Sequence, residues 1–190
     1  MSGKVEGGQG VRAQITQAAA EELRVPPAQI QVILGDTDLC PDDGPTVGSR
    51  STPNTIPSVR RGCAAARDVL IGLAATKWGA AKEALDTRDG AIVAKDGRRI
   101  AYGELAGDEQ VKAFTATVLT DEVQVTPVKD WKVLGASLPR PNGRDMVTGS
   151  HRFPSLIERP GMLYGKVLRA PAIGASMRAI DLKAVSYTHL

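Results

Sequence analysis

Hydrophobic side chains follow two helical patterns that are separated by a long polar loop. In the first segment they recur every four residues, at Val11, Ile15, Ala19 and Leu23. This spacing predicts a helix over residues 11–24, which the two prolines at 26 and 27 end. In the second segment they alternate between spacings of three and four, at Ile56, Val59, Cys63, Ala66, Leu70 and Leu73. This stripe predicts a longer helix from residue 56 to about residue 78.

Shorter hydrophobic runs predict strands. Residues 30–34 are typical of a short buried strand that ends at a Gly-Asp-Thr turn. Two Asp-Gly pairs, at 89–90 and 96–97, are hairpin-type turns that flank a strand over 91–94. A following strand ends at Ile100 and a helical turn starts at Tyr102. Further strands are predicted over residues 114–119, 123–125 and 163–168. The predicted fold class is α+β.

The order of these segments predicts a domain, a connector and the start of a second unit. Residues 127–147 contain prolines and an Asn-Gly pair, which are typical of a stiff, turning connector. We therefore expect a first domain over residues 1–126, a connector over 127–147 and a second unit over 148–184. Residues 185–190 break the amphipathic pattern and resemble a translated adapter, so they are interpreted as a non-native tail.

Composition narrows the classes of function. Of the 190 residues, 42% are hydrophobic, which is enough for a buried core, but only 4% are aromatic. The formal charge of +3 and the scarcity of aromatic rings argue against a nucleic-acid partner. The two cysteines, Cys40 and Cys63, are too few for an iron–sulfur site and form no zinc motif, and no stretch approaches a membrane span.

Two loops of small residues form the candidate binding site. Residues 7–10 read Gly-Gly-Gln-Gly and residues 48–53 read Gly-Ser-Arg-Ser-Thr-Pro, and each loop precedes a predicted helix. Small residues let the backbone approach a ligand closely, and a helix N-terminus offers free N–H groups with a partial positive charge. The two loops therefore predict two parts of one anion-binding pocket.

Simpler interpretations of these residues remain open. Gln9 also fits a loop glutamine that hydrogen-bonds its own backbone, and Ser51 or Thr52 fits a plain helix cap. Arg50 can pair with a phosphate, or with Asp42 or Asp43. The pair Asp36 and Asp38 is more typical of a turn than of a metal site. Arg60 and Arg61 are expected on a solvated helix face or against parts of a longer protein.

Several segments, in order, resemble the molybdenum hydroxylases. They are Gly-Lys-Val-Glu-Gly-Gly-Gln-Gly over residues 3–10, Ala-Glu-Glu-Leu over 20–23, Gly-Asp-Thr over 35–37 and the loop over 48–53. The connector segments Trp-Lys-Val-Leu-Gly over 131–135, Val-Thr-Gly over 147–149 and the runs over 160–165 and 167–171 continue the resemblance. The match is to the molybdopterin-binding large subunit of the xanthine dehydrogenase and aldehyde oxidase family, in the isoquinoline 1-oxidoreductase and aldehyde dehydrogenase-like branch.

The resemblance implies a fold, a cofactor and a set of binding residues. It implies a partial molybdopterin-binding domain followed by the start of an a/b hammerhead-like domain. Molybdopterin with molybdenum, in some members as a dinucleotide, would be held without a covalent bond. The residues carried over for this role are Gly8, Gln9, Gly10, Gly48, Ser49, Arg50, Ser51 and Thr52. A partner subunit would hold 2Fe–2S clusters that carry electrons away.

The resemblance also implies an activity, the hydroxylation of an aldehyde or an aromatic N-heterocycle with water as the oxygen source. The family's base is a glutamate in a Gly-x-Gly-Glu segment, which these 190 residues lack, so no catalytic residue and no protein metal ligand are assigned. We therefore expect a fragment of a large subunit that is inactive by itself. The alternatives are a non-catalytic phosphate- or nucleotide-binding module, and a nucleic-acid binder that uses Arg50, Arg60, Arg61 and Arg67.

Overall fold

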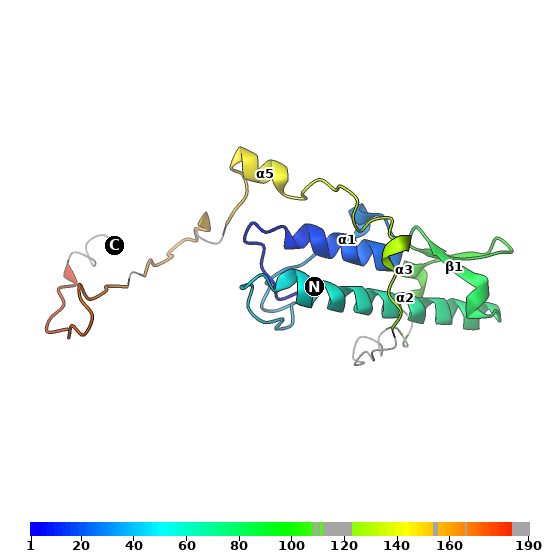
Figure 1. The fold of residues 1–190 in the computed structure, drawn as a ribbon, viewed down its shortest axis with the longest axis horizontal. Coiled ribbons are helices and arrows are strands. Elements are labelled where there is room, and N and C mark those ends of the chain that lie inside the picture. Colours follow the sequence, from blue (N-terminus) through cyan, green and yellow to red (C-terminus); the bar gives the residue numbers. More distant parts are fainter. Residues whose placement is uncertain (108, 110, 112–122, 154–155, 166, 184–190) are drawn as a thin grey trace. The chain divides into compact units, whose positions relative to one another are not determined.

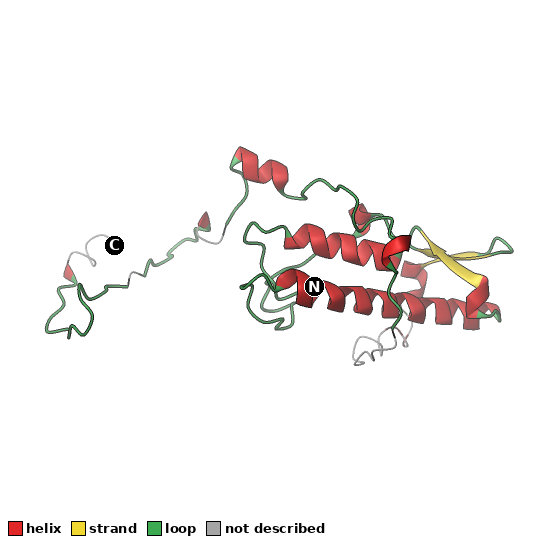
Figure 2. Ribbon diagram, in the orientation of Figure 1, coloured by secondary structure: helices red, strands yellow, loops and turns green. Residues whose placement is uncertain are grey.

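The computed structural model of the chain describes residues 1–107, 109, 111, 123–153, 156–165 and 167–183. It divides into two compact units, Met1–Gly143 and Arg144–Leu190. The first unit carries both predicted helices and a small sheet that includes the strand predicted over 91–94. The second unit contains α5 (Gly143–Thr148) and loops among its described residues (Figure 2).

Two long helices lie side by side in the first unit and begin at the same end (Figure 1). They are α1 (Val11–Leu23) and α2 (Ile56–Trp78), within one residue of the predicted bounds. Both helices carry small buried side chains, among them Ala18, Ala19, Ala64 and Ala65, and small side chains let two packed helix backbones approach closely. Helix α2 ends at Gly79, whose positive φ of 61° suits a glycine at the end of a helix.

A small antiparallel sheet packs against the second half of α2 (Figure 2). Its strands, in the order β1-β2-β3, are β1 (Leu85–Arg88), β2 (Ala91–Ala94) and β3 (Arg99–Ala101), and α3 (Tyr102–Leu105) follows directly. The turn between β1 and β2 has positive φ at both Asp89 and Gly90, as a tight Asp-Gly hairpin requires. The hydrophobic core lies between these elements and contains Leu70, Leu73, Ala74, Ile92, Ile100 and Leu105.

Three predicted strands differ from the structure. Residues 30–34 are extended and half-buried, but within the described residues they pair through a single bridge, between Ser2 and Leu34. Residues 123–125 and the described part of residues 163–168 form no strand. A run of hydrophobic residues does not make a strand unless a second segment pairs with it along its length, and within the described residues these positions have no more than the bridge to Ser2. The strand predicted over 114–119 lies entirely outside the described residues.

The predicted connector is not one continuous loop. Two short helices interrupt it, namely η4 (Val128–Asp130) and α5, and its first half packs against α1. The remaining short helices are η1 (Pro27–Gln29), η2 (Ser51–Thr55) and η3 (Lys82–Ala84). Among the described residues, no helix is both long enough and apolar enough to span a bilayer.

Replacement of Leu70 by aspartate should unfold the first unit. The Leu70 residue is 8% exposed within the core, and an unpaired buried charge costs several kcal/mol, which is comparable to the whole stability of a small domain. Thermal melting followed by circular dichroism should show no cooperative transition for Leu70→Asp. As a control, Thr76→Asp on the exposed face of α2 should change the Tm by only a few degrees. A native-like melting curve for Leu70→Asp would show that this face of α2 is not part of the core.

Candidate functional site

The structure brings the two predicted loops to the same end of the helix pair. The Thr52 hydroxyl donates a hydrogen bond to Gln14 Oε1 at 2.6 Å, which joins the second loop to the first turns of α1. The backbone N–H of Val5 donates to Thr46 Oγ1 at 3.0 Å. Val5 lies just before the first loop and Thr46 just before the second, so this hydrogen bond joins the segments that lead into the two loops. Because α1 and α2 begin at this end, the positive ends of both helix dipoles face it (Figure 1).

The first loop folds around the carboxylate of Glu6. Glu6 Oε1 accepts hydrogen bonds from the backbone N–H groups of Gly8 at 3.0 Å and Gly10 at 2.9 Å, and Oε2 accepts one from Arg12 at 3.1 Å. Arg140 Nη2 donates to the same carboxylate at 3.1 Å. Burial alone would raise the pKa of Glu6, but these donors outweigh it and hold the pKa below its usual value. This end of α1 therefore binds an anion in the structure, and the anion is the chain's own.

Gln9 hydrogen-bonds its own loop, as one of the two interpretations predicted. Its Oε1 atom accepts from the N–H of Gly7 at 2.7 Å, and its Nε2 atom donates to the carbonyl of Val5 at 2.8 Å. An amide nitrogen carries two N–H groups, so one donor of this exposed side chain is left for a ligand. A cofactor contact from Gln9 stays a prediction.

The second loop has an unusual backbone and no side-chain cap. Gly48 and Ser49 both have positive φ, 64° and 56°, and this conformation is uncommon for a residue other than glycine. The chain then enters η2, a π-helical turn, before α2 begins. Neither Ser51 nor Thr52 caps a helix N-terminus through its side chain, so the interpretation of this loop as a plain helix cap is wrong. The Thr52 hydroxyl donates to Gln14 instead.

Three side chains of the second loop have no partner within the part of the chain that the structure describes. They are the Ser49 and Ser51 hydroxyls and the Arg50 guanidinium, and Ser49 and Arg50 are exposed. The predicted alternative in which Arg50 pairs with Asp42 or Asp43 is not observed. Asp43 instead binds Lys4, Ser2 and Thr55, and Asp42 Oδ1 accepts from the backbone of Gly44. The loop therefore presents hydrogen-bond donors and a positive charge outward.

A buried carboxylate that the sequence analysis missed holds the first unit together. Glu22 is 0% exposed and accepts hydrogen bonds from Arg60 Nε at 2.8 Å and from the backbone N–H and hydroxyl of Thr126. Arg67 lies 3.7 Å from the same carboxylate.

The expectation that Arg60 lies on a solvated face is therefore wrong, and Arg60 and Arg67 are not available for nucleic acid. Glu22 falls on the stripe of Val11, Ile15 and Ala18, and a charge on an apolar stripe is the signal that could have revealed it.

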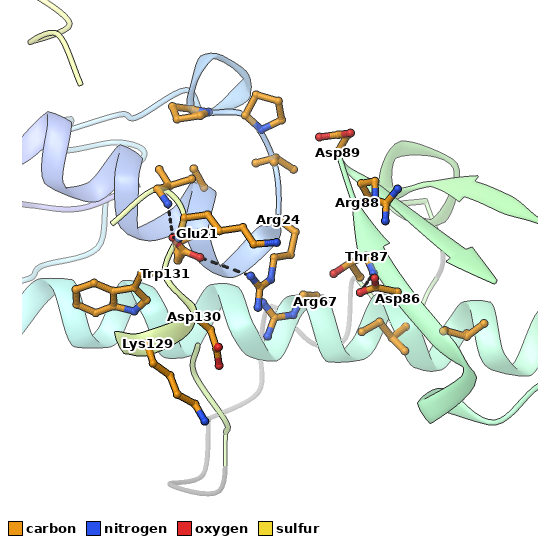
Figure 3. A pocket seen from close by; sticks show the side chains of 18 residues that line it. Glu21, Arg24, Arg67, Asp86, Thr87, Arg88, Asp89, Lys129, Asp130 and Trp131 are labelled. Carbon is orange, nitrogen blue, oxygen red and sulfur yellow. Dashed lines mark hydrogen bonds and ion pairs between the residues drawn. The ribbon is translucent and has the colours of Figure 1, made fainter. Parts of the chain in front are cut away.

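The neighbouring Glu21 fixes the connector. Its Oε2 atom accepts three successive backbone N–H groups, from Lys132 at 2.9 Å, Val133 at 2.6 Å and Leu134 at 3.0 Å. Its Oε1 atom lies 3.5 Å from Arg24 (Figure 3). Burial alone would raise the pKa of Glu21, but these donors outweigh it, so the pKa lies below its usual value.

A cavity of about 900 Å³ opens beside Glu21 at the other end of α1 (Figure 3). Both basic and acidic side chains line its wall, including Arg24, Arg67, Asp86 and Asp130. A second cavity, of about 560 Å³, lies between α1 and the connector and is mostly apolar. Neither of these two cavities is lined by a residue of the two predicted loops.

Metal-binding side chains do not cluster in the described residues, where no group of three or more His, Cys, Asp or Glu could hold an ion. Asp36 Oδ1 accepts from the backbone N–H groups of Asp38 and Leu39, both at 3.0 Å, which is the predicted turn. Burial raises the pKa of the Cys63 thiol to about 11, so this cysteine stays protonated and unreactive at neutral pH.

Residues 1–151 match the family described as the molybdopterin cofactor-binding domain. The chain therefore belongs to this family, that of the molybdenum hydroxylases.

Among curated proteins, the chain is similar to one subunit of the nicotinate dehydrogenase of Pseudomonas putida, with 28% identity over 98% of this chain and 16% of the relative. It is also similar to the beta subunit of isoquinoline 1-oxidoreductase of Brevundimonas diminuta, with 25% identity over 93% of this chain and 27% of the relative. A third relative is the gamma subunit of the 6-hydroxypseudooxynicotine dehydrogenase complex of Paenarthrobacter nicotinovorans, with 27% identity over 91% of this chain and 23% of the relative. The chain thus spans about a sixth to a quarter of the length of these relatives.

The variant Glu21→Gln should lower stability in a pH-dependent way. At pH 7 the loss should be about 2 kcal/mol, because an ionised acceptor of several hydrogen bonds is replaced by a neutral one. The folded-state pKa of Glu21 lies below its unfolded value of 4.5, so the contribution of its charge is complete above that value. It is then lost as the pH falls through the folded-state pKa. The difference between wild type and variant should therefore shrink below about pH 4.5.

Urea denaturation at a series of pH values between 7 and 3 measures this difference. The matched control is Glu83→Gln, because Glu83 is exposed, and its effect should be close to zero throughout. A stability difference for Glu21→Gln that stays constant across the series would contradict the assigned role of the charge.

Proposed function

We propose that this chain forms part of the large subunit of a molybdenum-dependent oxidoreductase, and that its two loops bind the molybdopterin cofactor. The observation that carries the proposal is the convergence of residues 7–10 and 48–52 at the N-terminal end of the helix pair in a member of the molybdopterin cofactor-binding family. The enzyme would hydroxylate an aldehyde or an aromatic N-heterocycle, with water as the source of oxygen.

The donors of the two loops fit an anionic cofactor. The second loop offers the Ser49 and Ser51 hydroxyls and the Arg50 guanidinium, none of which has a partner within the described residues. Ser49 keeps a positive φ in an exposed loop, and strained backbone of this kind clusters where chains bind ligands. Hydroxyl, guanidinium and backbone N–H donors next to two helix N-termini suit a group with two negative charges.

In the first loop, the cofactor and Glu6 would compete for the same donors. Gly8 and Gly10 direct their N–H groups to the Glu6 carboxylate, so a phosphate can use them only if this carboxylate turns away. Arg140 binds both Glu6 and the carbonyl of Gly8, so it can keep the released carboxylate paired. The remaining N–H group of Gln9 Nε2 needs no rearrangement and is the simplest contact of this loop to the cofactor.

The chain's contribution to the reaction is to hold and orient the cofactor. The bound molybdenum centre would supply the redox chemistry, and the base that assists it is assigned to a different part of the protein. The proposal thus gives this chain no catalytic residue. Residues 148–184 are proposed as the start of an a/b hammerhead-like unit, and residues 185–190 as a non-native tail.

The names of the relatives support parts of this proposal. Two of them are named for aromatic N-heterocycles, nicotinate and isoquinoline, which favours that substrate class over aldehydes. All three are named as subunits, which supports a partner subunit, and we propose that this partner carries 2Fe–2S clusters. We also propose the dinucleotide form of the cofactor, because the chain resembles a family in which some members use this form.

Replacement of Arg50 by methionine should weaken cofactor binding without affecting the fold. The guanidinium has no partner within the described residues, so the Tm of the cofactor-free protein should stay within a few degrees of wild type. Loss of one charge-assisted hydrogen bond to an anion should lower the affinity roughly tenfold or more. The full-length protein, produced with its partner in a host that makes molybdopterin, should contain less molybdenum and less pterin per mole.

The matched control is Arg99→Met, because Arg99 is exposed on β3, away from the loops. Equal molybdenum and pterin contents in Arg50→Met and wild type would remove Arg50 from the site. If the wild-type protein holds neither, the proposed function itself is wrong. Micromolar binding of simple nucleotides in calorimetry would then favour the phosphate- or nucleotide-binding module.

Gln9→Ala should lower cofactor retention and turnover of the full-length enzyme while the domain stays folded. Gln9 is exposed, and its two hydrogen bonds lie within its own loop, so the effect on global stability should be small. Molybdenum analysis and steady-state kinetics test this expectation, with Gln31→Ala at another exposed position as the control. Unchanged molybdenum content and turnover in Gln9→Ala would refute the role of Gln9.

A further inference from the structure

Lys4 is a buried lysine whose partners lie just ahead of the second loop. The residue is 3% exposed, although lysine is almost never buried without a partner. Its ammonium group donates to three successive backbone carbonyls, those of Asp43, Gly44 at 3.1 Å and Pro45 at 3.2 Å. An ammonium group has three N–H donors, so this set satisfies all of them.

Asp43 supplies the opposite charge and joins the segments on either side of the second loop. Its carboxylate lies 3.8 Å from Lys4 Nζ and accepts a hydrogen bond from the hydroxyl of Ser2. It also accepts from Thr55 Oγ1, at 3.3 Å and 3.4 Å to its two oxygens. Asp43 precedes the loop and Thr55 follows it, so one carboxylate closes residues 44–54 into a loop with fixed ends.

The segment that contains Lys4 lies close against this loop. A Cβ atom at Gly3 would stand 2.5 Å from the carbonyl oxygen of Pro41, so only glycine permits this approach. The backbone of Val5 continues the contact through its hydrogen bond to Thr46. Four residues after Lys4 the chain reaches Gly8, in the first loop. The pair Lys4 and Asp43 therefore connects the two loops, because Lys4 lies a few residues before the first loop and Asp43 a few residues before the second.

A stabilising role alone accounts poorly for this ion pair. A buried pair of charges often stabilises a protein no more than a well-packed apolar pair, because both charges lose their hydration. What an apolar side chain cannot do is bind three successive carbonyls and so determine the path of a polar loop. The contacts of Lys4 are of that kind, and the loop that they hold carries Gly48, Ser49, Arg50, Ser51 and Thr52.

We propose that Lys4 and Asp43 are positioning residues that fix the second loop relative to the first. They lie beneath the loops and do not contact the cofactor themselves. This inference rests on the proposed function, since it assigns to the pair the spacing of the two halves of the cofactor site.

The test combines a measurement on the loop with a measurement on the cofactor. Lys4→Met removes the charge and keeps most of the side-chain volume. Hydrogen exchange of the cofactor-free, full-length protein should become faster in residues 44–52, by about tenfold or more, and stay unchanged in the hairpin over residues 85–101. Pterin content per mole of folded protein should fall by a similar factor.

Two further variants make the result decisive. Lys82→Met breaks an exposed ion pair of 3.0 Å with Asp68, far from the loops in sequence, and should change neither measurement. Asp43→Asn removes the charge with almost no change of shape, so it provides the test if Lys4→Met does not fold.

Faster exchange in the loop together with lower pterin content would support the proposal. Exchange equal to wild type would overturn it, as would faster exchange with an unchanged pterin content. A wild-type protein without pterin would overturn the proposed function and with it the cofactor role of the pair, whereas the exchange data would still report whether Lys4 anchors the loop.

Discussion

Glu22 buries a full negative charge between α1, α2 and Thr126. Such a burial costs several kcal/mol unless hydrogen bonds and opposite charges compensate for it, and Arg60, Arg67 and Thr126 do so here. Each of these partners comes from a segment that must be folded and in place before the charge is satisfied. The carboxylate therefore couples the two helices and the residue just before the connector into one unit.

This coupling also determines the direction of α2 relative to α1. Glu22 near the end of α1 meets Arg60 and Arg67 on α2, whereas Gln14 near the start of α1 meets Thr52 just before α2. Contacts in this order require the helices to run in parallel. Parallel helices place both positive dipole ends on the same side, which is the side of the two glycine-containing loops. The anion-binding role proposed for this end of the helix pair thus depends on a contact far from it along α1.

Charged side chains, and not apolar ones, order the polar segments of this domain. The first loop folds around Glu6, the second is held by Lys4 and Asp43, and the connector is held by Glu21. A sequence with only 4% aromatic residues has few large side chains with which to anchor long loops. Backbone groups of these loops are satisfied by buried charges instead, so the loops keep defined paths without a hydrophobic core of their own.

Elements whose signal is local could be predicted from the order of the amino acids. Periodic apolar side chains predicted α1 and α2 within one residue, and two Asp-Gly pairs predicted β2 and its turns. Features that depend on partners distant in sequence could be seen only in the folded chain. Residues 30–34 stayed without a neighbouring strand, Ser51 and Thr52 did not cap a helix, and Arg60 turned inward to Glu22. The reason is that the periodic spacing of apolar residues shows only which face of a segment is apolar. The partner of a charge such as Glu22 lies 104 residues away at Thr126, and the two meet only when the chain folds.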